Sequence, residues 1–521
     1  MNDLLIRNGL VHDGLGNEAV VADVAVAGDR VVAVGADLGE ARRVIDASGR
    51  LVAPGFIDPH AHSDMVPLMW EPQPFKLLQG VTTEIVGNCG YSFAPLTEES
   101  VEEARVSFGD LAAGATIEAG SFADYLARVE AAGPTNHVAA LVGHNTLRLT
   151  ANGVRTALSD GALEEMCRLT DEAFAAGAVG LSTGLIYIPG TYSDRDEIVA
   201  LGTVAHRWRR IYTTHMRDEG LALEAALDEA IDVGRRAGIR VQISHCKAAG
   251  TPSHGKSRVL LDKLRAARLE GIDVRGDQYP YLAGGTFLNA LFPAEAREGG
   301  IAAFQSRLRD RDEAERLRKR AEEGTDETSG LWAQATPEGV IVIRHHNESA
   351  TGRTLAAIAA GRDAWEVACE LVADDPTSMM VITLMDEDDV RTIMADPLIS
   401  IGSDNGMPVG LDHPRTWGCF PRFLGRYVRE LGVVSWPEAI RKMTSSTATQ
   451  FGLGGRGWLG RGAVADICVF DPETVGHDGT YERPDVKPTG VDCVVLAGEV
   501  VVDAGEFTGE RRGRVLRAAS L

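Results

Sequence analysis

The sequence has few cysteines and no long apolar run. Only seven of its 521 residues are cysteine, and they stand far apart, at positions 89, 167, 246, 369, 419, 468 and 493. A secreted disulfide framework uses an even set in a short chain, so we expect free thiols. No segment approaches the roughly 20 consecutive apolar residues of a membrane span, and the first residues show no basic leader. We therefore expect a cytoplasmic protein without a membrane partner.

Basic residues are also scarce. Lys and Arg number 52 against 75 Asp and Glu, which gives a net charge of −23. Proteins that bind nucleic acid usually carry the opposite excess because they neutralise phosphates, so we expect no nucleic-acid partner. The 44% hydrophobic and 24% charged content excludes a disordered or fibrous chain. The length allows about three domains, or one barrel with smaller units.

Runs rich in Val and Ile near both ends of the chain predict short strands. They are residues 3–8, 20–27 and 30–36 at one end, and 464–471 and 491–503 at the other. A few short strands cannot bury a core alone. We therefore expect residues 1–54 and 451–521 to pair into one small β-sandwich.

The middle of the chain alternates short apolar segments with longer helical stretches, which predicts an α/β fold with a parallel sheet. Eight strands are expected, the number that closes a TIM-type (β/α)8 barrel: 56–63, 82–89, 138–145, 178–185, 211–218, 240–247, 272–279 and 398–405. The segment between the seventh and eighth expected strands is too long for one crossover connection, and it contains an expected charged helix at 303–324. We therefore divide the barrel into 55–284 and 351–450, with an inserted lid at 285–350 over the barrel mouth.

Metal-binding residue types collect at the carboxyl ends of these predicted strands, the face where barrel enzymes place their active sites. They are His60, His62, Cys89, His215, His245 and Asp404. Singly, each has an ordinary explanation, such as a hydrogen-bonding histidine, a packed cysteine or a turn aspartate. Together, nitrogen and sulfur donors at one rim indicate a Zn²⁺ site.

Other histidines are expected outside the ligand set. His144, near the end of the third strand, is expected to support a ligand or to lie in the core. His345 and His346 follow an expected strand of the lid, and we assign them to the surface or to the lid.

Six motifs together resemble the D-aminoacylase branch of the amidohydrolase superfamily, over nearly the whole chain. They are GFIDPHAHSD (55–64), GVTTEIVGNCG (80–90), THMRDE (214–219), ISHCKAAG (243–250), QYPYLAGGT (278–286) and GSDNGMP (402–408). GNCG and ISHxK separate this branch from the dihydroorotases and hydantoinases, whose barrels commonly carry a metal-bridging carbamylated lysine after strand four. The expected fourth strand here has no lysine.

The resemblance implies that Cys89 takes the place of that lysine. Cys89, His215 and His245 would hold one tight zinc ion, and His60 and His62 would form a weaker or empty second site. Whether one or two metals bind stays open.

The resemblance also implies a reaction, the hydrolysis of N-acyl-D-amino acids. Asp404 would take a proton from water and return it to the leaving amine. Lys247, Tyr279 and Arg415 would bind the α-carboxylate of the substrate. Exposed positions for Lys247 and Arg415, and Tyr281 in place of Tyr279, are the alternatives.

The substrate side chain is less constrained. The loop at 283–300 begins with apolar residues, so we expect neutral or hydrophobic D-amino acids with broad tolerance. Leu288, Leu291 and Phe292 would line the pocket or pack the lid, whereas Arg297 would favour an acidic side chain if it pointed inward.

Two other functions compete with this hypothesis. The same barrel could catalyse another amidohydrolase reaction, as a cyclic amidase or dipeptidase, because fold does not fix substrate. A non-catalytic scaffold is the third alternative. The missing lysine counts against the first and the complete ligand set against the second, while the oligomeric state and lid movement stay open.

Overall fold

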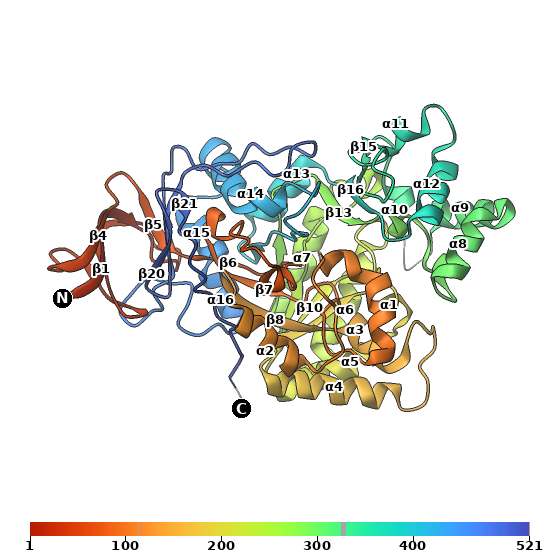
Figure 1. The fold of residues 1–521 in the computed structure, drawn as a ribbon, viewed down its shortest axis with the longest axis horizontal. Coiled ribbons are helices and arrows are strands. Elements are labelled where there is room, and N and C mark those ends of the chain that lie inside the picture. Colours follow the sequence, from red (N-terminus) through yellow and green to blue (C-terminus); the bar gives the residue numbers. More distant parts are fainter. Residues whose placement is uncertain (113, 325–329, 520–521) are drawn as a thin grey trace.

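The computed structural model describes residues 1–112, 114–324 and 330–519, and its centre is a parallel eight-stranded sheet (Figure 1). The strands follow one another in chain order: β6 (Phe56–Asp58), β7 (Val81–Val86), β8 (His137–Gly143), β9 (Gly180–Gly184), β10 (Ile211–His215), β11 (Val241–Ile243), β12 (Val274–Gln278) and β17 (Ile399–Ile401). All seven neighbouring pairs are parallel. Each lies within or beside an expected segment, which confirms the predicted barrel.

The first and last strands of this sheet meet at the carboxyl end of the barrel. One isolated parallel bridge joins Ala61 to Asn405. The Asp404 N–H donates to the His60 carbonyl at 2.8 Å, and the His62 N–H donates to the Asn405 carbonyl at 3.2 Å. We call this contact between β6 and β17, with the residues that follow each strand, the seam.

Helices that follow the strands in the chain cover the outside of the barrel. They are α2 (Phe122–Ala132), α3 (His144–Asn152), α4 (Ala162–Ala176), α5 (Arg195–Arg207), α6 (Leu223–Ala237), α7 (Ser257–Leu269), α13 (Glu387–Ala395), α15 (Trp436–Met443) and α16 (Ser445–Phe451). In α6, Leu223, Leu227 and Ile231 recur at helical spacing and are buried, while Arg235 and Arg236 are exposed in its last turn. This amphipathic pattern packs one face of the helix against the strands.

The two ends of the chain form a separate mixed sheet of nine strands, in which red and blue strands lie together (Figure 1). Its strands are β1 (Asn2–Val11), β2 (Val20–Ala27), β3 (Arg30–Gly35), β4 (Ala41–Asp46), β5 (Leu51–Pro54), β18 (Ile467–Phe470), β19 (Val491–Leu496), β20 (Glu499–Asp503) and β21 (Glu506–Phe507). Antiparallel pairing of β5 with β18 joins the two ends. Apolar residues of both ends share one buried cluster, which includes Ile6, Val52 and Val495. The expected pairing of the chain ends is confirmed.

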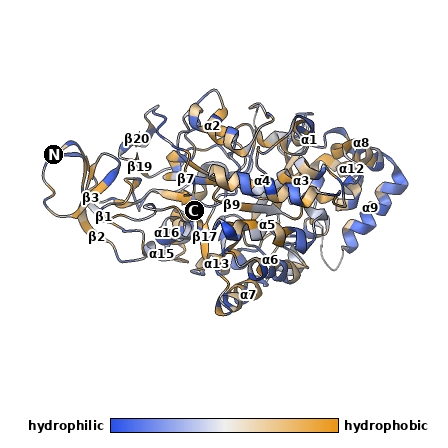
Figure 2. Ribbon diagram, turned by 90° about the horizontal axis from the view of Figure 1, so that it is seen from below, coloured by the Kyte–Doolittle hydropathy of each residue, from blue (hydrophilic) through white to orange (hydrophobic). Residues whose placement is uncertain are grey.

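The insertion carries its own antiparallel sheet, in the order β13-β16-β14-β15. Its strands are β13 (Ala283–Phe287), β14 (Val340–Arg344), β15 (Arg353–Thr354) and β16 (Met379–Thr383), and its helices include α8 (Ile301–Arg309), α9 (Arg311–Glu323), α10 (Leu331–Gln334), α11 (Leu355–Ala359) and α12 (Ala364–Asp374). Figure 2 shows α9 as a largely hydrophilic helix far from the N-terminus. The strand β16 lies in the range that we assigned to the barrel. In the structure it belongs to the insertion, because it pairs with both β13 and β14. We therefore propose limits of 283–383 for the insertion, in place of 285–350.

A helix α1 (Glu98–Phe108) follows β7, and α14 (Arg415–Arg422) follows β17.

Among the described residues, no helix combines the length and apolar character that crossing a bilayer requires.

Candidate metal centre

All six predicted metal-site residues meet at the carboxyl end of the barrel. His60 and His62 follow β6, Cys89 follows β7, His215 ends β10, His245 follows β11 and Asp404 follows β17. The strands are shorter than expected, so most of these side chains come from the first residues of the loops. Their atoms nevertheless lie at contact distance, as the rim of a parallel barrel requires.

The loop that carries Cys89 is shaped by glycines. Gly87 and Gly90 both have a φ of 79°, a left-handed conformation that glycine adopts without strain. A Cβ on Gly87 would lie 2.2 Å from the Leu141 carbonyl oxygen, and one on Gly184 would lie 2.0 Å from the Cys89 carbonyl oxygen. The GNCG motif and the end of β9 therefore fit together only with these small residues.

Cys89 lies at the centre of the histidines. Its Sγ is 3.3 Å from His60 Nε2 and 3.6 Å from His245 Nε2. His245 Nε2 is in turn 2.9 Å from His215 Nδ1. The side chains of His60 and His245 are buried, as is most of His215. Four side chains that can bind a metal therefore lie in contact at a place where water has little access.

The donor set fits zinc. Bonds of about 2.3 Å to sulfur and about 2.0–2.1 Å to nitrogen place neighbouring ligands of a tetrahedral ion about 3.3–3.6 Å apart. The separations from Cys89 Sγ fall in that range. Ligand atoms of His60, Cys89, His245 and Asp404 all lie within 4.8 Å of one another. His215 Nε2 is buried and has no hydrogen-bond partner among the described residues, so an ion would also relieve this cost.

The pKa of the Cys89 thiol supports metal binding. Burial alone would raise it, but charge on His60 and His62 lowers it well below its usual value. The thiolate is the form that binds metals. Burial opposes charge on His60 as well, yet Cys89, Asp277 and Asp404 raise the pKa of His60 well above its ordinary value.

Three site residues adopt left-handed backbone conformations although none is glycine. The φ angles are 53° at Cys89, 37° at His245 and 48° at Asp404. Such conformations cost about 1–3 kcal/mol each and persist only where the surrounding structure holds them. Their coincidence at three strand ends indicates a site whose geometry is maintained at the expense of stability.

Asp404 connects the histidines to an arginine. Its Oδ1 is 3.3 Å from His60 Nε2 and 3.2 Å from His62 Nε2, and its Oδ2 is 2.9 Å from Arg415 NH1. Burial would raise the pKa of Asp404, but Arg415 and His60 lower it well below its usual value. These neighbours therefore favour the ionised form of the Asp404 carboxyl.

The three expected carboxylate-binding residues also lie together. The guanidinium of Arg415 stacks over the Tyr279 ring, 4.6 Å from its centre, and Lys247 Nζ lies 5.8 Å from the same centre. All three are buried, so exposed positions for Lys247 and Arg415 are excluded. Tyr281 instead lies beside Arg422 and His413.

Glu219 is a site residue that we did not predict from the sequence. Its Oε1 lies 2.6 Å from Lys247 Nζ and 2.9 Å from His245 Nδ1. Burial opposes ionisation, but Lys247 and His245 lower the pKa of Glu219 strongly. The available signal was its position four residues after His215, in the motif THMRDE.

Asp277, near the end of β12, is a second residue of the site that we did not predict from the sequence. Its Oδ1 accepts the His245 N–H at 2.8 Å and lies 3.3 Å from His60 Nδ1. Contacts between a carboxylate and a ligating histidine orient the ring. Asp277 and Glu219 therefore fix the orientation of two of the predicted ligands.

The three other histidines that we considered in the sequence lie outside this cluster, as expected. His144 Nε2 lies 2.6 Å from Glu197 Oε1, a carboxylate that also binds Arg148, so His144 has a core role. His345 is buried in the insertion, where its Nε2 donates to the Leu371 carbonyl at 3.2 Å, so of the two expected positions it has the one in the lid. His346 is exposed beside Asp374.

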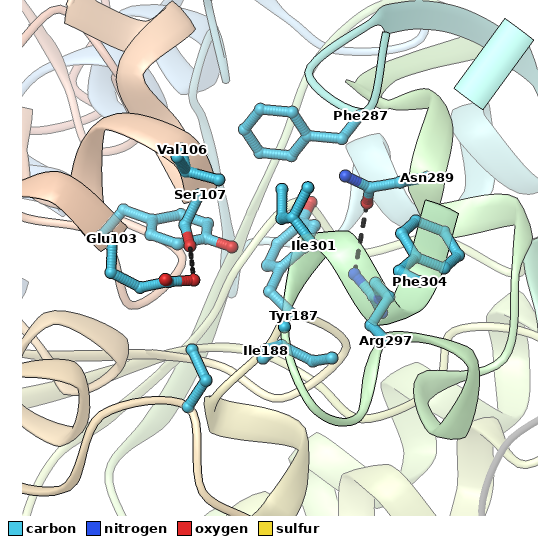
Figure 3. Close-up of a pocket in the computed structure, with 13 residues that line it drawn as sticks. Glu103, Val106, Ser107, Tyr187, Ile188, Phe287, Asn289, Arg297, Ile301 and Phe304 are labelled. Carbon is cyan, nitrogen blue, oxygen red and sulfur yellow. Dashed lines mark hydrogen bonds between the residues drawn. The ribbon is translucent and has the colours of Figure 1, made fainter. Parts of the chain in front are cut away.

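A second pocket, which Figure 3 shows, shares lining residues with the cavity of the metal-site residues. Tyr91, Tyr187 and Phe287 line both this pocket and the cavity that contains Cys89 and Asp404. Ile301 and Phe304 of α8 add apolar surface from the insertion. Leu288, Leu291 and Phe292 do not line this pocket; they are buried in a core cluster, where they pack the insertion.

Arg297 lies in the wall of that second pocket (Figure 3). It donates to Asn289 Oδ1 at 3.2 Å, and its Nε is buried without a hydrogen-bond partner among the described residues. No carboxylate of the described residues forms an ion pair with Arg297. Burial lowers its pKa.

Comparisons with known proteins agree with this geometry. The sequence profile of the amidohydrolase family matches residues 43–502. A D-aminoacylase of Alcaligenes xylosoxydans xylosoxydans is 37% identical over 520 residues, 99% of this chain and 97% of the relative.

Two solved structures cover 99% of this chain and all of their own. One is an N-acyl-D-glutamate deacylase from Bordetella bronchiseptica, complexed with zinc and a phosphonate mimic of the tetrahedral intermediate (34% identity, TM-score 0.85). The other is a D-aminoacylase with a binuclear metal centre, described as showing one-metal activation and second-metal attenuation (35% identity, TM-score 0.85). This chain therefore belongs to the amidohydrolase family, in the D-aminoacylase branch that its motifs predict.

Proposed function

We propose that this protein is a zinc-dependent N-acyl-D-amino-acid deacylase, which hydrolyses the amide bond to a carboxylate and a free D-amino acid. The observation that carries the proposal is the position of Asp404, which contacts His60 and His62 through one oxygen and Arg415 through the other. A base is thereby placed between a metal-binding cluster and a cation for the substrate. The related deacylases support the substrate class and its D configuration.

Cys89, His215 and His245 would hold the tight zinc ion, and His60 and His62 the weaker second one. The one-metal activation described for the related D-aminoacylase supports a single tight equivalent. When bound, zinc supplies Lewis acidity toward the acyl oxygen and makes a water more acidic.

Asp404 acts as general base and then as general acid. Because Arg415 keeps it ionised, it can accept a proton from the attacking water. The same carboxyl then returns the proton to the departing nitrogen. In an α-amino acid the carboxylate carbon and this nitrogen are bonded to the same carbon, so a substrate carboxylate on Arg415 brings the nitrogen close to Asp404.

Lys247, Tyr279 and Arg415 bind the α-carboxylate in this proposal. Arg415 offers a planar fork that matches a carboxylate, and both cations lie within 6 Å of the Tyr279 ring centre, Lys247 at 5.8 Å and Arg415 at 4.6 Å. Lys247 and Arg415 are already paired with Glu219 and Asp404. The substrate carboxylate therefore joins an existing charge network, and its own desolvation is offset by two buried cations.

The aromatic pocket of Tyr91, Tyr187 and Phe287 would take the substrate side chain (Figure 3). Its apolar walls support neutral or hydrophobic side chains such as those of D-Leu, D-Met and D-Phe. Arg297 adds one cation to the same pocket, so a D-Glu side chain is accepted as well, which is the broad tolerance that we expect.

The test is amine release from N-acetyl derivatives of D- and L-Met, Leu, Phe and Glu by the zinc-loaded protein. We expect turnover of the D series alone. The Asp404→Asn variant should lose about 10²- to 10⁴-fold in kcat, the usual contribution of a general acid-base group. Asp389→Asn serves as the control, because this buried carboxylate caps the Gly255 N–H outside the site.

Turnover of neither series by a zinc-replete sample would refute the proposal and direct the search to cyclic amides. Equal turnover by wild type and Asp404→Asn would refute the role of Asp404.

A further inference from the structure

A buried lysine lies behind the metal centre, at the seam between β6 and β17. Lys76 has no exposed surface and precedes a short turn of helix, Leu77–Gln79, that leads into β7. Its Nζ donates to Asp58 Oδ2 at 2.5 Å, Asn405 Oδ1 at 2.8 Å and Ser403 Oγ at 3.0 Å. Glu84 Oε2 lies 3.6 Å away. None of these groups is a predicted ligand or base.

The three partners stand next to the catalytic residues in the sequence. Asp58 comes two residues before His60, and Ser403 and Asn405 flank Asp404. Lys76 therefore contacts both strands of the seam through residues that immediately adjoin the site.

Asp58 carries the connection into the backbone. Its Oδ1 accepts the His60 N–H at 3.1 Å and the Ser403 N–H at 2.9 Å. Its Oδ2 accepts the Ser403 hydroxyl at 2.5 Å as well as the Lys76 ammonium. One carboxylate thus fixes the main chain on both sides of the seam, and Lys76 fixes that carboxylate.

The seam has little else to fix its width. Both β6 and β17 have only three residues, and they meet through the single bridge from Ala61 to Asn405. Each of the other seven strand pairs of the barrel forms a ladder of at least three residue pairs. Side chains must therefore supply much of the restraint at this closure.

The seam also separates two parts of the proposed catalytic group. His60 and His62 follow β6, whereas Asp404 follows β17. Cys89, His215 and His245, the proposed tight ligands, come from strands β7, β10 and β11. A change in seam width would displace Asp404 from His60 and His62 but leave the tight ligand set in place.

We propose that Lys76 is a positioning residue, which through Asp58, Ser403 and Asn405 holds His60 and His62 at the distance from Asp404 that the reaction needs. The proposal rests on the proposed function for its kinetic consequence. Its consequence for metal binding does not depend on the substrate.

The test compares Lys76→Met with Lys442→Met. Lys442 is a second lysine without exposed surface, and its Nζ donates to the Ile399 carbonyl at 2.8 Å and to the Asp396 carbonyl, near the start of β17. It contacts no site residue. Lys76→Met alone leaves the buried Asp58 carboxylate without its cation, which could impair folding. The double variant Asp58→Asn/Lys76→Met removes both charges and so separates this effect from the role of Lys76.

Three quantities are measured on folded protein: kcat and KM for N-acetyl-D-Leu, the affinity for a first and second zinc equivalent by titration, and the near-ultraviolet cobalt-thiolate absorption after cobalt substitution. For both Lys76 variants we expect kcat to fall about 10- to 100-fold, the loss that a displacement of about 1 Å can cause. We expect KM to change less than about threefold. The second zinc equivalent should bind at least about tenfold more weakly, with the first equivalent and the thiolate band unchanged.

Lys442→Met should keep kcat and both zinc affinities while losing thermal stability. Equal kcat and second-site affinity in Lys76→Met and wild type would overturn the proposal. Loss of the thiolate band and the first equivalent in both Lys76 variants would also overturn it, because the lysine would then support the whole site. If wild type lacks deacylase activity, the function proposal fails, and the zinc titration alone decides the role of Lys76.

Discussion

Gly184 lies so close to Cys89 that a Cβ at position 184 would be 2.0 Å from the Cys89 carbonyl oxygen. Gly184 ends β9, the fourth strand, where the barrels of related branches commonly carry a metal-binding lysine. Here the end of that strand has a residue without a side chain, and the backbone of the loop that carries Cys89 occupies the space beside it. The exchange of lysine for cysteine that we propose would thus depend on packing as well as on ligand chemistry.

Gly184→Ala should displace the Cys89 loop. An added methyl group in a closely packed site typically costs about 1–3 kcal/mol, so we expect tight zinc to bind about 10- to 100-fold more weakly. Competition with a chelator measures this affinity. Gly454→Ala is the control, because a Cβ there meets nothing within 4 Å. If Gly184→Ala binds zinc with wild-type affinity, the loop that carries Cys89 moves at little cost in free energy, which contradicts the prediction.

Cys89→Ser should lose the tight zinc ion, because a hydroxyl is a far weaker ligand than a thiolate for this borderline-soft metal. His62→Ala is the matched comparison, since His62 belongs to the proposed second site. We expect His62→Ala to retain one zinc equivalent after dialysis and Cys89→Ser to retain less than about a tenth. Elemental analysis measures both. Retention of zinc by Cys89→Ser and its loss from His62→Ala would reverse the assignment of the two sites.

Arg297→Met should change side-chain selectivity. A hydrogen bond to a charged group contributes about 1.5–3 kcal/mol, so kcat/KM for N-acetyl-D-Glu should fall about 10- to 100-fold. The value for N-acetyl-D-Leu should stay within about threefold, because the aromatic walls of the pocket are unchanged. Arg316→Met, which removes an exposed arginine of the same insertion, is the control. An unchanged ratio of the two substrates would place the side chain elsewhere.

Asp466 should make stability depend on acid pH. Burial would raise its pKa, but His137 and Arg456, together with the Ala497 N–H, lower it from 3.8 to about 2. The unfolded chain then binds the proton more tightly than the folded protein, so the stabilisation is complete above about pH 4 and disappears as the pH falls toward 2. Two pKa units correspond to roughly 2–3 kcal/mol.

The measurement is urea unfolding of wild type and Asp466→Asn between pH 6 and pH 3. The variant should be less stable by about 2 kcal/mol at pH 6, and the difference should shrink at pH 3. A difference that stays constant across this range would mean that Asp466 stabilises the protein by shape and hydrogen bonding and not by its charge.

The sequence determined the barrel and the chemical character of the site. Apolar strands alternating with helices are a local pattern, and the eight segments are all present in the structure. Because the carboxyl ends of parallel strands meet at one rim, the positions of His60, Cys89, His215, His245 and Asp404 could be predicted to converge. The motifs were specific enough to identify the family.

The tertiary structure alone decided how buried charges are paired. Glu219, Asp277 and Lys76 belong to the site network, yet none was singled out from the sequence, because an isolated charged residue has no periodicity that reveals its partner. Arg415 was expected as a carboxylate ligand, but only the structure shows that it also binds Asp404. The wider limits that we propose for the insertion also rest on distant pairing, since β16 pairs with strands about 40 and 95 residues earlier in the chain. Contacts of this kind depend on how distant segments are brought together, and the barrel must close before they exist.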